Sequence, residues 1–520
     1  MDKWRAMNAL PIVFFVLLLP FFFAFLGPLL FLFINSFSGI DREVIFSGIS
    51  ARILWFNYSQ AFLSSVLAGI VGVFFAFVLC ELKIFGKKII TKISEITFFL
   101  PTLLVVLAII GVWGNHGWLG RNLANSSLYG WVGILLAHVF LNFSVYLRLV
   151  GEQLKRSDRT EEKVALSLGA SRWNALLSIT LKKIQPAIFQ SFILVFVYCS
   201  SSFVVLMLLG GGPRFSGVET AIYQAVKVDL DLPLAVSLAT IQVLVCVTAH
   251  LFYKLPSQPS IASHEGFREK LYFVRSRKKS LVINLIVWIV FGLIVLLPIL
   301  NLLCSGFSGL PELSIEELKN SLMASSVLGL KVAVLATFLA FSSAYVVHHP
   351  LNSVLKKAVN FFSLLPVAIS TMVLGVACTL TLRSFWTWEG EFSWGVIFIQ
   401  SLSCLPIGFR ILSMAFSKIE LEVYSTAKSL GASDVQVLTH LEMPIVKSAL
   451  ATCFVTSFGI SLGEVGALLL FESQGNPTIS ILIFKLMGKY HFNEAYSIGI
   501  VLLILMALVL ALKEKWEIYR

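Results

Sequence analysis

Two short stretches of the chain repeat each other and decide how the rest of it is organised. Residues 162–171 read EKVALSLGAS, and residues 424–433 read YSTAKSLGAS. Both are polar, helix-forming segments set between very apolar ones. Each predicts a short helix that ends at a glycine, Gly169 or Gly431, because glycine reaches the left-handed conformation that closes a helix without a steric penalty.

A second helix is expected to begin at the serine that follows each Gly-Ala pair. Ser433 has Gln436 three residues later, which fits a capping box, whereas Ser171 has Asn174 and keeps only the capping serine. One such glycine alone would more often belong to an ordinary loop. Two of them, each followed by Ala-Ser, favour a helix–turn–helix that docks onto a partner.

The composition is that of a membrane protein. The 520 residues are 58% hydrophobic and only 13% charged, with a mean hydropathy of +0.88, and a water-soluble protein of this size needs more charge to cover its surface. The seven cysteines are scattered through apolar stretches without a C-x-x-C pair. That pattern argues against a disulfide framework and against a metal site.

Runs of about 20 apolar residues mark membrane-spanning helices. The first set lies at 10–34, 60–82, 95–113, 129–150, 185–209 and 230–252, and the second at 281–304, 322–346, 358–382, 393–415, 445–470 and 493–512. The first run is too long for a signal peptide and lacks a small-residue cleavage site, so we assign it as a helix. The sequence predicts an all-α polytopic membrane protein of about 12 transmembrane helices, with a six-helix half at 1–252, a linker at 253–280 and a second six-helix half at 281–520.

Lysine and arginine counts near the ends of the spans predict the orientation, because cytoplasmic loops carry an excess of these residues. With both termini in the cytoplasm, both glycine turns are cytoplasmic and 30 of the 40 Lys and Arg residues lie on that side. Lys331 falls within a span, and the outer side holds the other nine: Arg42, Arg52, Arg121, Arg214, Lys227, Lys319, Arg383, Lys485 and Lys489. The basic residues behind the net charge of +12, such as those at 275–279, are thus expected to anchor the chain beside anionic lipid. They leave no soluble basic surface that could bind nucleic acid.

The two halves are repeats of each other. A shift of 262 residues places Gly133 on Gly395, Arg148 on Arg410 and Gly169 on Gly431, and similar shifts of 261 and 265 align earlier segments. Because both halves have the same number of spans, the repeats are parallel and are expected to be related by a pseudo-twofold axis along the membrane normal. A solute pathway would then lie between them.

The duplicated segment resembles the EAA loop of permease subunits of ABC importers, whose pattern is EAA, three residues, Gly, nine residues and I-x-L-P. The second copy, at about 419–444, keeps Ala427, Gly431, Leu441 and Pro444. The first copy, at about 158–183, keeps Ala165, Gly169, Ile179 and Leu181, but Lys182 replaces the proline. Lys163 and Ser425 stand where the leading Glu is expected, so the detailed contacts of the loops differ from the family pattern.

Two such loops in one chain resemble the fused permeases of the ferric-iron and thiamine importer group. The stretches GWL at 117–119, GILLAHVF at 133–140, LGGGP at 209–213 and AIYQA at 221–225 are most similar to its thiamine-transporting members. The resemblance implies a type I ABC importer permease fold in the bacterial inner membrane. It also implies alternating-access transport of thiamine or thiamine phosphates, with a ferric-iron or polyamine importer as the alternative and an ion-gradient-driven secondary transporter as an alternative of another class.

The family implies two protein partners, a cytoplasmic ATP-binding subunit dimer and a periplasmic solute-binding protein. The chain contains no G-x-x-x-x-G-K-[ST] phosphate loop, so we expect no enzymatic activity and no cofactor in this chain, with ATP and magnesium held by the ATPase. The residues expected to couple to that ATPase are Lys163, Ala165, Gly169, Ala170, Ser171, Ser425, Ala427, Gly431, Ala432, Ser433 and Pro444.

Ionisable side chains within spans normally face a cavity or a partner, because burying them in lipid costs a few kcal/mol. Glu464 is expected well inside the span at 445–470, either as a pathway carboxylate suited to a cationic solute or as a gate or packing hydrogen-bond acceptor. Lys331 either pairs with Glu464 or extends toward the outer interface. We assign Glu464, Ser202 and Lys331 to the translocation path.

Other polar residues have structural or surface interpretations. His138 and Asn142 lie one helical turn apart, and interhelical hydrogen bonding is favoured over a metal pair. His348 and His349 are expected in a solvated cytoplasmic turn. Two outer loops are candidates for contact with the binding protein, with interfacial anchoring as the alternative, and their residues are Trp386, Trp388, Glu389 and Glu391 in one and Glu312, Glu316 and Glu317 in the other.

Overall fold

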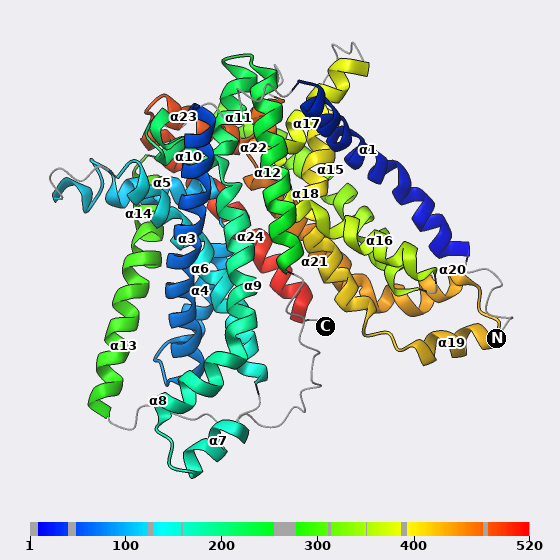
Figure 1. Cartoon of the computed structure of the whole chain (residues 1–520), viewed down its shortest axis with the longest axis horizontal. Helices are drawn as coiled ribbons and strands as arrows, with labels where there is room; N and C mark the ends of the chain where they lie inside the picture. Colours follow the sequence, from blue (N-terminus) through cyan, green and yellow to red (C-terminus); the bar gives the residue numbers. More distant parts are fainter. Residues whose placement is uncertain are drawn as a thin grey trace. The chain divides into compact units, whose positions relative to one another are not determined.

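The computed structural model describes residues 9–39, 48–122, 128–157, 160–253, 277–309, 314–349, 351–385, 393–471 and 477–518, which form helices joined by short turns (Figure 1). In this part of the chain, ten helical spans are long and apolar enough to cross a membrane. Two bent pairs of helices raise the number to 12 if each pair is one span. The prediction of an all-α protein with about 12 spans is confirmed.

The spans of the first sequence half follow one another with short elements between them. They comprise α1 (Ala9–Gly39), α3 (Gly48–Glu81), the bent pair α4 (Lys87–Phe99) and α5 (Thr102–Trp113), α6 (Trp131–Arg156), α9 (Leu181–Ser200) and α12 (Leu232–Tyr253). Between α6 and α9 lie α7 (Thr160–Ser167), α8 (Arg172–Ala175) and the π-helical turn η3 (Leu176–Thr180). Between α9 and α12 lie α10 (Phe203–Leu209) and α11 (Val218–Lys227).

The second half repeats this order. Its spans comprise α13 (Arg277–Phe291) continued by η5 (Gly292–Leu296) and α14 (Leu297–Ser308), α15 (Ile315–His348), the bent pair α16 (Ser353–Leu364) with η7 (Leu365–Ala368) and α17 (Thr371–Phe385), α18 (Ser393–Phe416), α21 (Met443–Gly463) and α24 (Phe492–Ile518). Between α18 and α21 lie α19 (Leu421–Ser429), α20 (Asp434–Gln436) and η8 (Val437–Glu442). After α21 come α22 (Gly466–Leu470) and α23 (Ile479–Gly488).

Four of the expected continuous spans are broken, and at these places the sequence-based prediction is wrong. The pair α4 and α5 is bent by 115° and the pair α16 to α17 by 105°. At the first of these breaks Pro101 forces Leu100 into an extended conformation, with ψ at 131°. The expected spans at 185–209 and 445–470 break after α9 and after α21.

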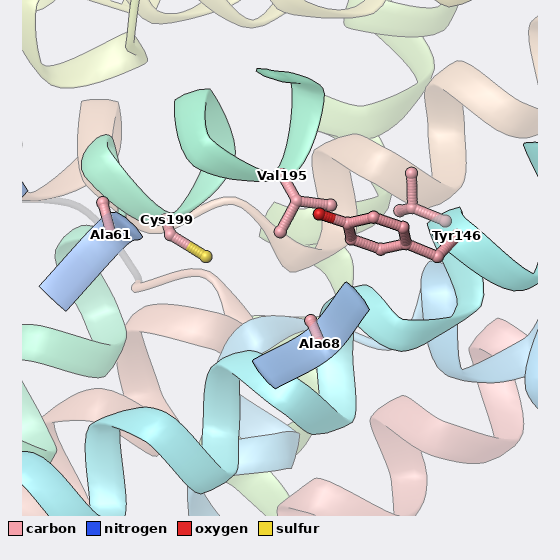
Figure 2. Packing of buried hydrophobic residues seen from close by; sticks show 6 residues of the cluster. Ala61, Ala68, Tyr146, Val195 and Cys199 are labelled. Atoms are coloured by element: carbon pink, nitrogen blue, oxygen red, sulfur yellow. The ribbon is translucent and has the colours of Figure 1, made fainter. Parts of the chain in front are cut away.

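The chain divides into two compact units. One contains residues 46–221 and 244–308, and its core is the packing of α3, α6 and α9. Figure 2 shows Ala61 and Ala68 of α3 facing Tyr146 of α6 together with Val195 and Cys199 of α9. The Tyr146 hydroxyl donates a hydrogen bond to the Ser65 carbonyl at 2.9 Å, which satisfies a polar group within the apolar core.

Helices α13 and α14 belong to the same unit although they begin the second sequence half. α14 packs against α5, and the Asn301 amide donates to the Gly111 carbonyl at 3.1 Å. The Trp288 indole donates to the Phe85 carbonyl at 3.0 Å, and the Asn284 side-chain oxygen accepts from the Phe85 amide at 2.7 Å.

The other unit contains residues 1–45, 222–243 and 309–520, and in it α15, α18 and α21 pack together. α1 packs against α15 and α17, with Phe14 edge-on to Phe341 at 5.6 Å between ring centroids and Phe22 against Phe362 at 5.4 Å. In each unit, therefore, one of the packed spans comes from the start of the other sequence half.

The close packing of α3 on α6 gives a stability prediction at Gly72. A Cβ atom there would lie 2.4 Å from the Phe143 carbonyl oxygen and 2.5 Å from the Tyr146 Cβ, so Gly72→Ala must push the helices apart. We expect a loss of about 1–3 kcal/mol, measured by thermal unfolding of the purified protein in detergent. Gly151→Ala on α6 is the matched control, because its Cβ meets nothing within 4 Å. Equal melting temperatures for the two variants would contradict the packing.

Candidate functional site

Both glycine turns have the predicted conformation. Gly169 has a φ of 90° and Gly431 a φ of 88°, in the left-handed region. In the first turn the Ala170 amide donates to the Ala165 carbonyl at 3.0 Å and the Gly169 amide to the Leu166 carbonyl at 3.1 Å. The second turn has the same two bonds, from Ala432 to Ala427 at 3.1 Å and from Gly431 to Lys428 at 3.0 Å. This is the Schellman motif, which satisfies the last carbonyls of a helix.

The serine caps are also confirmed. The Ser433 hydroxyl accepts from the Gln436 amide at 3.2 Å, and the Gln436 side chain accepts from the Ser433 amide at 2.9 Å, which completes the capping box. The Ser171 hydroxyl accepts from the Asn174 amide at 3.2 Å. We call α7, α8 and η3 the first docking segment and α19, α20 and η8 the second.

Each docking segment presents a leucine at its turn. Leu168 and Leu430, which directly precede the two glycines, are each 84% exposed. A single exposed leucine is common on protein surfaces, so the feature that sets these two apart is that the same side chain is exposed at both turns. Around the turns, Lys163, Ser171, Ser433 and Pro444 are exposed, whereas Ala165, Ala170, Ser425, Ala427 and Ala432 are partly buried.

The second docking segment is fixed to the end of α15 by a buried polar contact. His349 Nε2 lies 2.6 Å from Glu442 Oε1, and the two side chains are only 5% and 1% exposed. The expectation of a solvated turn at His349 is therefore wrong, because Glu442 gives the imidazole a buried partner. An aromatic cluster encloses the contact, with Tyr345 stacked on the His349 ring at 3.8 Å and Tyr424 edge-on at 5.4 Å.

Tyr424 links this cluster to the electrostatics of the second segment. Burial, followed by the negative charges of Asp434 and Glu442, raises the pKa of its hydroxyl to about 12, so the phenol stays protonated at neutral pH. Lys428 of α19 forms an ion pair with Asp434 of α20, which ties the two short helices together across the glycine turn.

The first docking segment uses different residues at the corresponding places. The shift of 262 residues that aligns the two glycines places Glu162 on Tyr424 and Thr180 on Glu442. The Thr180 hydroxyl donates to the buried Glu162 carboxylate at 2.8 Å, between α7 and η3. Lys183 and Glu161 add an ion pair at 3.3 Å, with the Glu161 side chain 70% exposed.

Ser202 and Glu464 lie at the breaks that follow α9 and α21. The same shift of 262 residues aligns them, and their ψ angles of 100° and 138° are extended rather than helical. The expectation that Glu464 lies inside a continuous helix is therefore wrong. Its partly buried carboxylate accepts from the Thr371 hydroxyl at 2.8 Å and from the Ala467 amide at 3.3 Å. It thus joins the break after α21 to the start of α17.

Buried polar side chains satisfy the carbonyl groups that the breaks leave without helical partners. The Asn57 amide donates to the Ser200 carbonyl at 3.1 Å and the Gln60 amide to the Cys199 carbonyl at 3.0 Å. At the other break the Ser480 hydroxyl donates to the Leu462 carbonyl at 2.5 Å. These residues are not among those assigned from the sequence, although Asn57 and Gln60 lie about one helical turn apart where the predicted span at 60–82 begins.

Interhelical hydrogen bonding by His138 and Asn142 is confirmed. His138 Nδ1 lies 3.0 Å from the Ser64 hydroxyl of α3, and the Asn142 amide lies 3.5 Å from Cys199 Sγ of α9. Gln400 occupies the position of His138 in the second half and accepts from the Ser461 hydroxyl at 2.6 Å. Within the described ranges, no group of three or more metal-ligating side chains is present.

The remaining assigned residues have simpler surroundings. Lys331 is exposed on α15 beside the exposed Leu330 and Val334, and no described ion pair joins it to Glu464. Glu316 and Glu317 are exposed in the first turn of α15. Trp386, Trp388, Glu389, Glu391, Glu312 and the linker at 254–276 lie outside the described residues.

Comparison with known proteins gives one family and several relatives. The family described as "Binding-protein-dependent transport system inner membrane component" matches twice, at residues 68–258 and 333–513. The chain is 28% identical over 474 residues to the thiamine transport system permease protein ThiP of Haemophilus influenzae, covering 88% of this chain and 87% of that protein. It is 27% identical over 480 residues to ThiP of Escherichia coli, covering 89% and 88%. A probable sulfate transport system permease protein, cysT of Chlorella vulgaris, is 28% identical over 34% of this chain and 68% of that protein.

The left-handed turn makes a local stability prediction at Gly431. A Cβ there meets nothing within 4 Å, so the effect of a substitution comes from the backbone conformation alone. Gly431→Ala should cost about 1–2 kcal/mol, and Gly431→Asn less, because asparagine tolerates this conformation better. Hydrogen–deuterium exchange of the amides at 425–436 should be fastest in the alanine variant. An alanine variant that exchanges as slowly as the parent protein would contradict the strained turn.

Proposed function

Because this chain belongs to the family of binding-protein-dependent transport system inner membrane components, we propose that it is the permease subunit of an ATP-driven importer that carries thiamine or thiamine phosphates. The two family matches fall one in each sequence half, which fits a fused permease that supplies both halves of the transport path. The choice of solute is supported by the two ThiP proteins, whose similarity extends over nearly the whole chain.

The duplicated docking segment carries the proposal of an ATPase partner. Two turns with the same hydrogen bonds and the same exposed leucine suit two copies of one partner surface, as an ATPase dimer would offer. Each leucine would fill an apolar pocket of the partner. The exposed residues around it, which include Val164 in the first segment and Val435 in the second, would exclude water from the contact. ATP and magnesium would bind to that partner, because this sequence has no phosphate loop.

A solute-binding protein would deliver thiamine from the outer side of the membrane. Binding-protein dependence is part of the family description, and the exposed carboxylates of Glu316 and Glu317 offer one polar surface for such a contact. We propose that Glu464, Ser202 and Lys331 contribute to the translocation path. Broken helices at matched positions of two repeats are the places where transporters commonly bind or gate their solutes, and Glu464 and Ser202 occupy two such positions.

Uptake of labelled thiamine tests the proposal. In cells that lack their own importer, this chain expressed with its neighbouring ATPase and binding protein should give saturable uptake. Excess ferric iron or polyamine should not compete, and substitution of the ATPase catalytic glutamate should abolish the uptake. If a well-expressed, ATPase-associated complex took up no thiamine, the proposal that thiamine is the solute would be wrong. If uptake persisted after the ATPase substitution, the proposal that ATP hydrolysis drives it would be wrong.

Leucine variants provide the coupling control. Leu430→Asp and Leu168→Asp change side chains that are 84% exposed, so the fold should tolerate both. Both are expected to reduce retention of the ATPase and thiamine uptake together at equal expression. Unchanged retention of the ATPase in both variants would show that these turns are not its docking sites.

The orientation is a further part of the proposal, with both termini and both docking segments in the cytoplasm. The excess of Lys and Arg on that side supports it. Green fluorescent protein fused to the C-terminus should fluoresce, whereas alkaline phosphatase fused there should be inactive, because the phosphatase folds only outside the cytoplasm. Active phosphatase would reverse the orientation.

A further inference from the structure

We propose that the buried contact between His349 and Glu442 is the joint through which the second docking segment moves the membrane-spanning part of its unit. The inference rests on the function proposed above, because it assigns His349 and Glu442 a positioning role in ATP-driven transport. The motif that the segment resembles, I-x-L-P, leaves the position of Glu442 unspecified. Its buried partner lies 93 residues away in the sequence.

The hydrogen bonds of His349 determine how many protons the joint holds. Nδ1 lies 2.8 Å from the Tyr345 carbonyl oxygen, which only accepts, so Nδ1 carries a proton. Nε2 lies 2.6 Å from Glu442 Oε1, so one further proton lies between the imidazole and the carboxyl group. The pair therefore has no net charge. Its bonded atoms are buried, and among the described residues Glu442 Oε2 has no hydrogen-bond partner.

The joint connects the end of α15 to the end of the second docking segment. His349 directly follows α15 and is bonded back to it through Tyr345, whereas Glu442 ends η8, immediately before α21 begins. Tyr424 of α19 and Phe416 at the end of α18 both lie edge-on to the His349 ring. A displacement of the docking segment is thus transmitted directly to α15, which packs along α18 and α21.

A directional polar contact is suited to this role. Apolar side chains can slide past one another, but a buried pair cannot separate without leaving a polar or charged group without a partner. In the first docking segment the corresponding residue is Thr180, and its described bond to Glu162 lies within the segment itself. The residue identities therefore place a buried imidazole–carboxyl joint in the second half of the chain.

Glu442→Gln is the first test, because the amide keeps the size of the side chain and removes the acid. The test uses the complex reconstituted with the ATPase and the binding protein. We expect the number of solute molecules transported per ATP hydrolysed to fall about tenfold, which is within the range typical of coupling between distant sites. ATPase binding and the melting temperature should change little, which separates loss of coupling from loss of assembly. The exchanged pair His349→Glu with Glu442→His should recover most of the lost transport.

Ser401→Ala is the matched control on the same helix packing. It removes a buried hydroxyl on α18 that lies 2.7 Å from the Ile397 carbonyl of its own helix and 3.3 Å from the Val332 carbonyl of α15, away from the joint. This variant should change transport per ATP less than Glu442→Gln does. If the exchanged pair does not fold, the neutral pair His349→Gln with Glu442→Gln replaces it and should transport better than either single variant.

The outcomes separate this inference from the proposed function. A parent complex without ATP-dependent uptake would overturn the proposed function and the joint with it. Normal transport per ATP in Glu442→Gln would overturn the joint alone. A loss of transport matched by an equal loss of melting temperature or of ATPase binding would also overturn it, because the contact would then serve stability only.

Discussion

The structure depends on satisfying backbone polar groups wherever a helix breaks within an apolar segment. Lipid offers no hydrogen bonds, so each carbonyl released by a break must find a partner inside the protein. Asn57 and Gln60 supply those partners after α9, and Ser480 supplies one after α21. Glu464 adds a carboxylate that accepts from the amide of the next short helix and from Thr371 across the neighbouring break. The breaks after α9 and α21 are therefore stabilised by specific hydrogen bonds from side chains of other helices.

The two halves share a backbone plan but differ in the groups that stabilise it. At matched positions, Ser202 faces the break in one half and Glu464 in the other, and Thr180 stands where Glu442 forms its buried contact with His349. In these two pairs the acidic residue lies in the second half, whereas the buried Glu162 of the first half matches Tyr424 of the second. Duplication accounts for the common geometry of the glycine turns, whereas the unlike side chains give the halves different charge and different mechanical connections.

Local features could be predicted from the sequence, and features that depend on distant partners could not. Gly169, Gly431 and the capping box of Ser433 and Gln436 are determined by residues within one or two helical turns, so their conformations followed from the printed sequence. The breaks after α9 and α21 were missed because an apolar run has the same composition whether its helix is continuous or broken. His349 was placed in solvent because Glu442, 93 residues away, cannot be identified as its partner by any local pattern.

The division of the chain into two units also depends on contacts between residues that are distant in the sequence. The repeat alignment divides the sequence near the linker at 253–280, but α13 and α14 follow that linker and pack with α5, whereas α1 precedes it and packs with α15 and α17. The opening helices of each sequence half therefore bury their apolar side chains against spans encoded in the other half. A half expressed alone would expose the surfaces on which those helices lie, such as the Gly111 carbonyl that accepts from Asn301. Sequence repeats and folding units are consequently different divisions of this chain, and each half requires the other to complete its core.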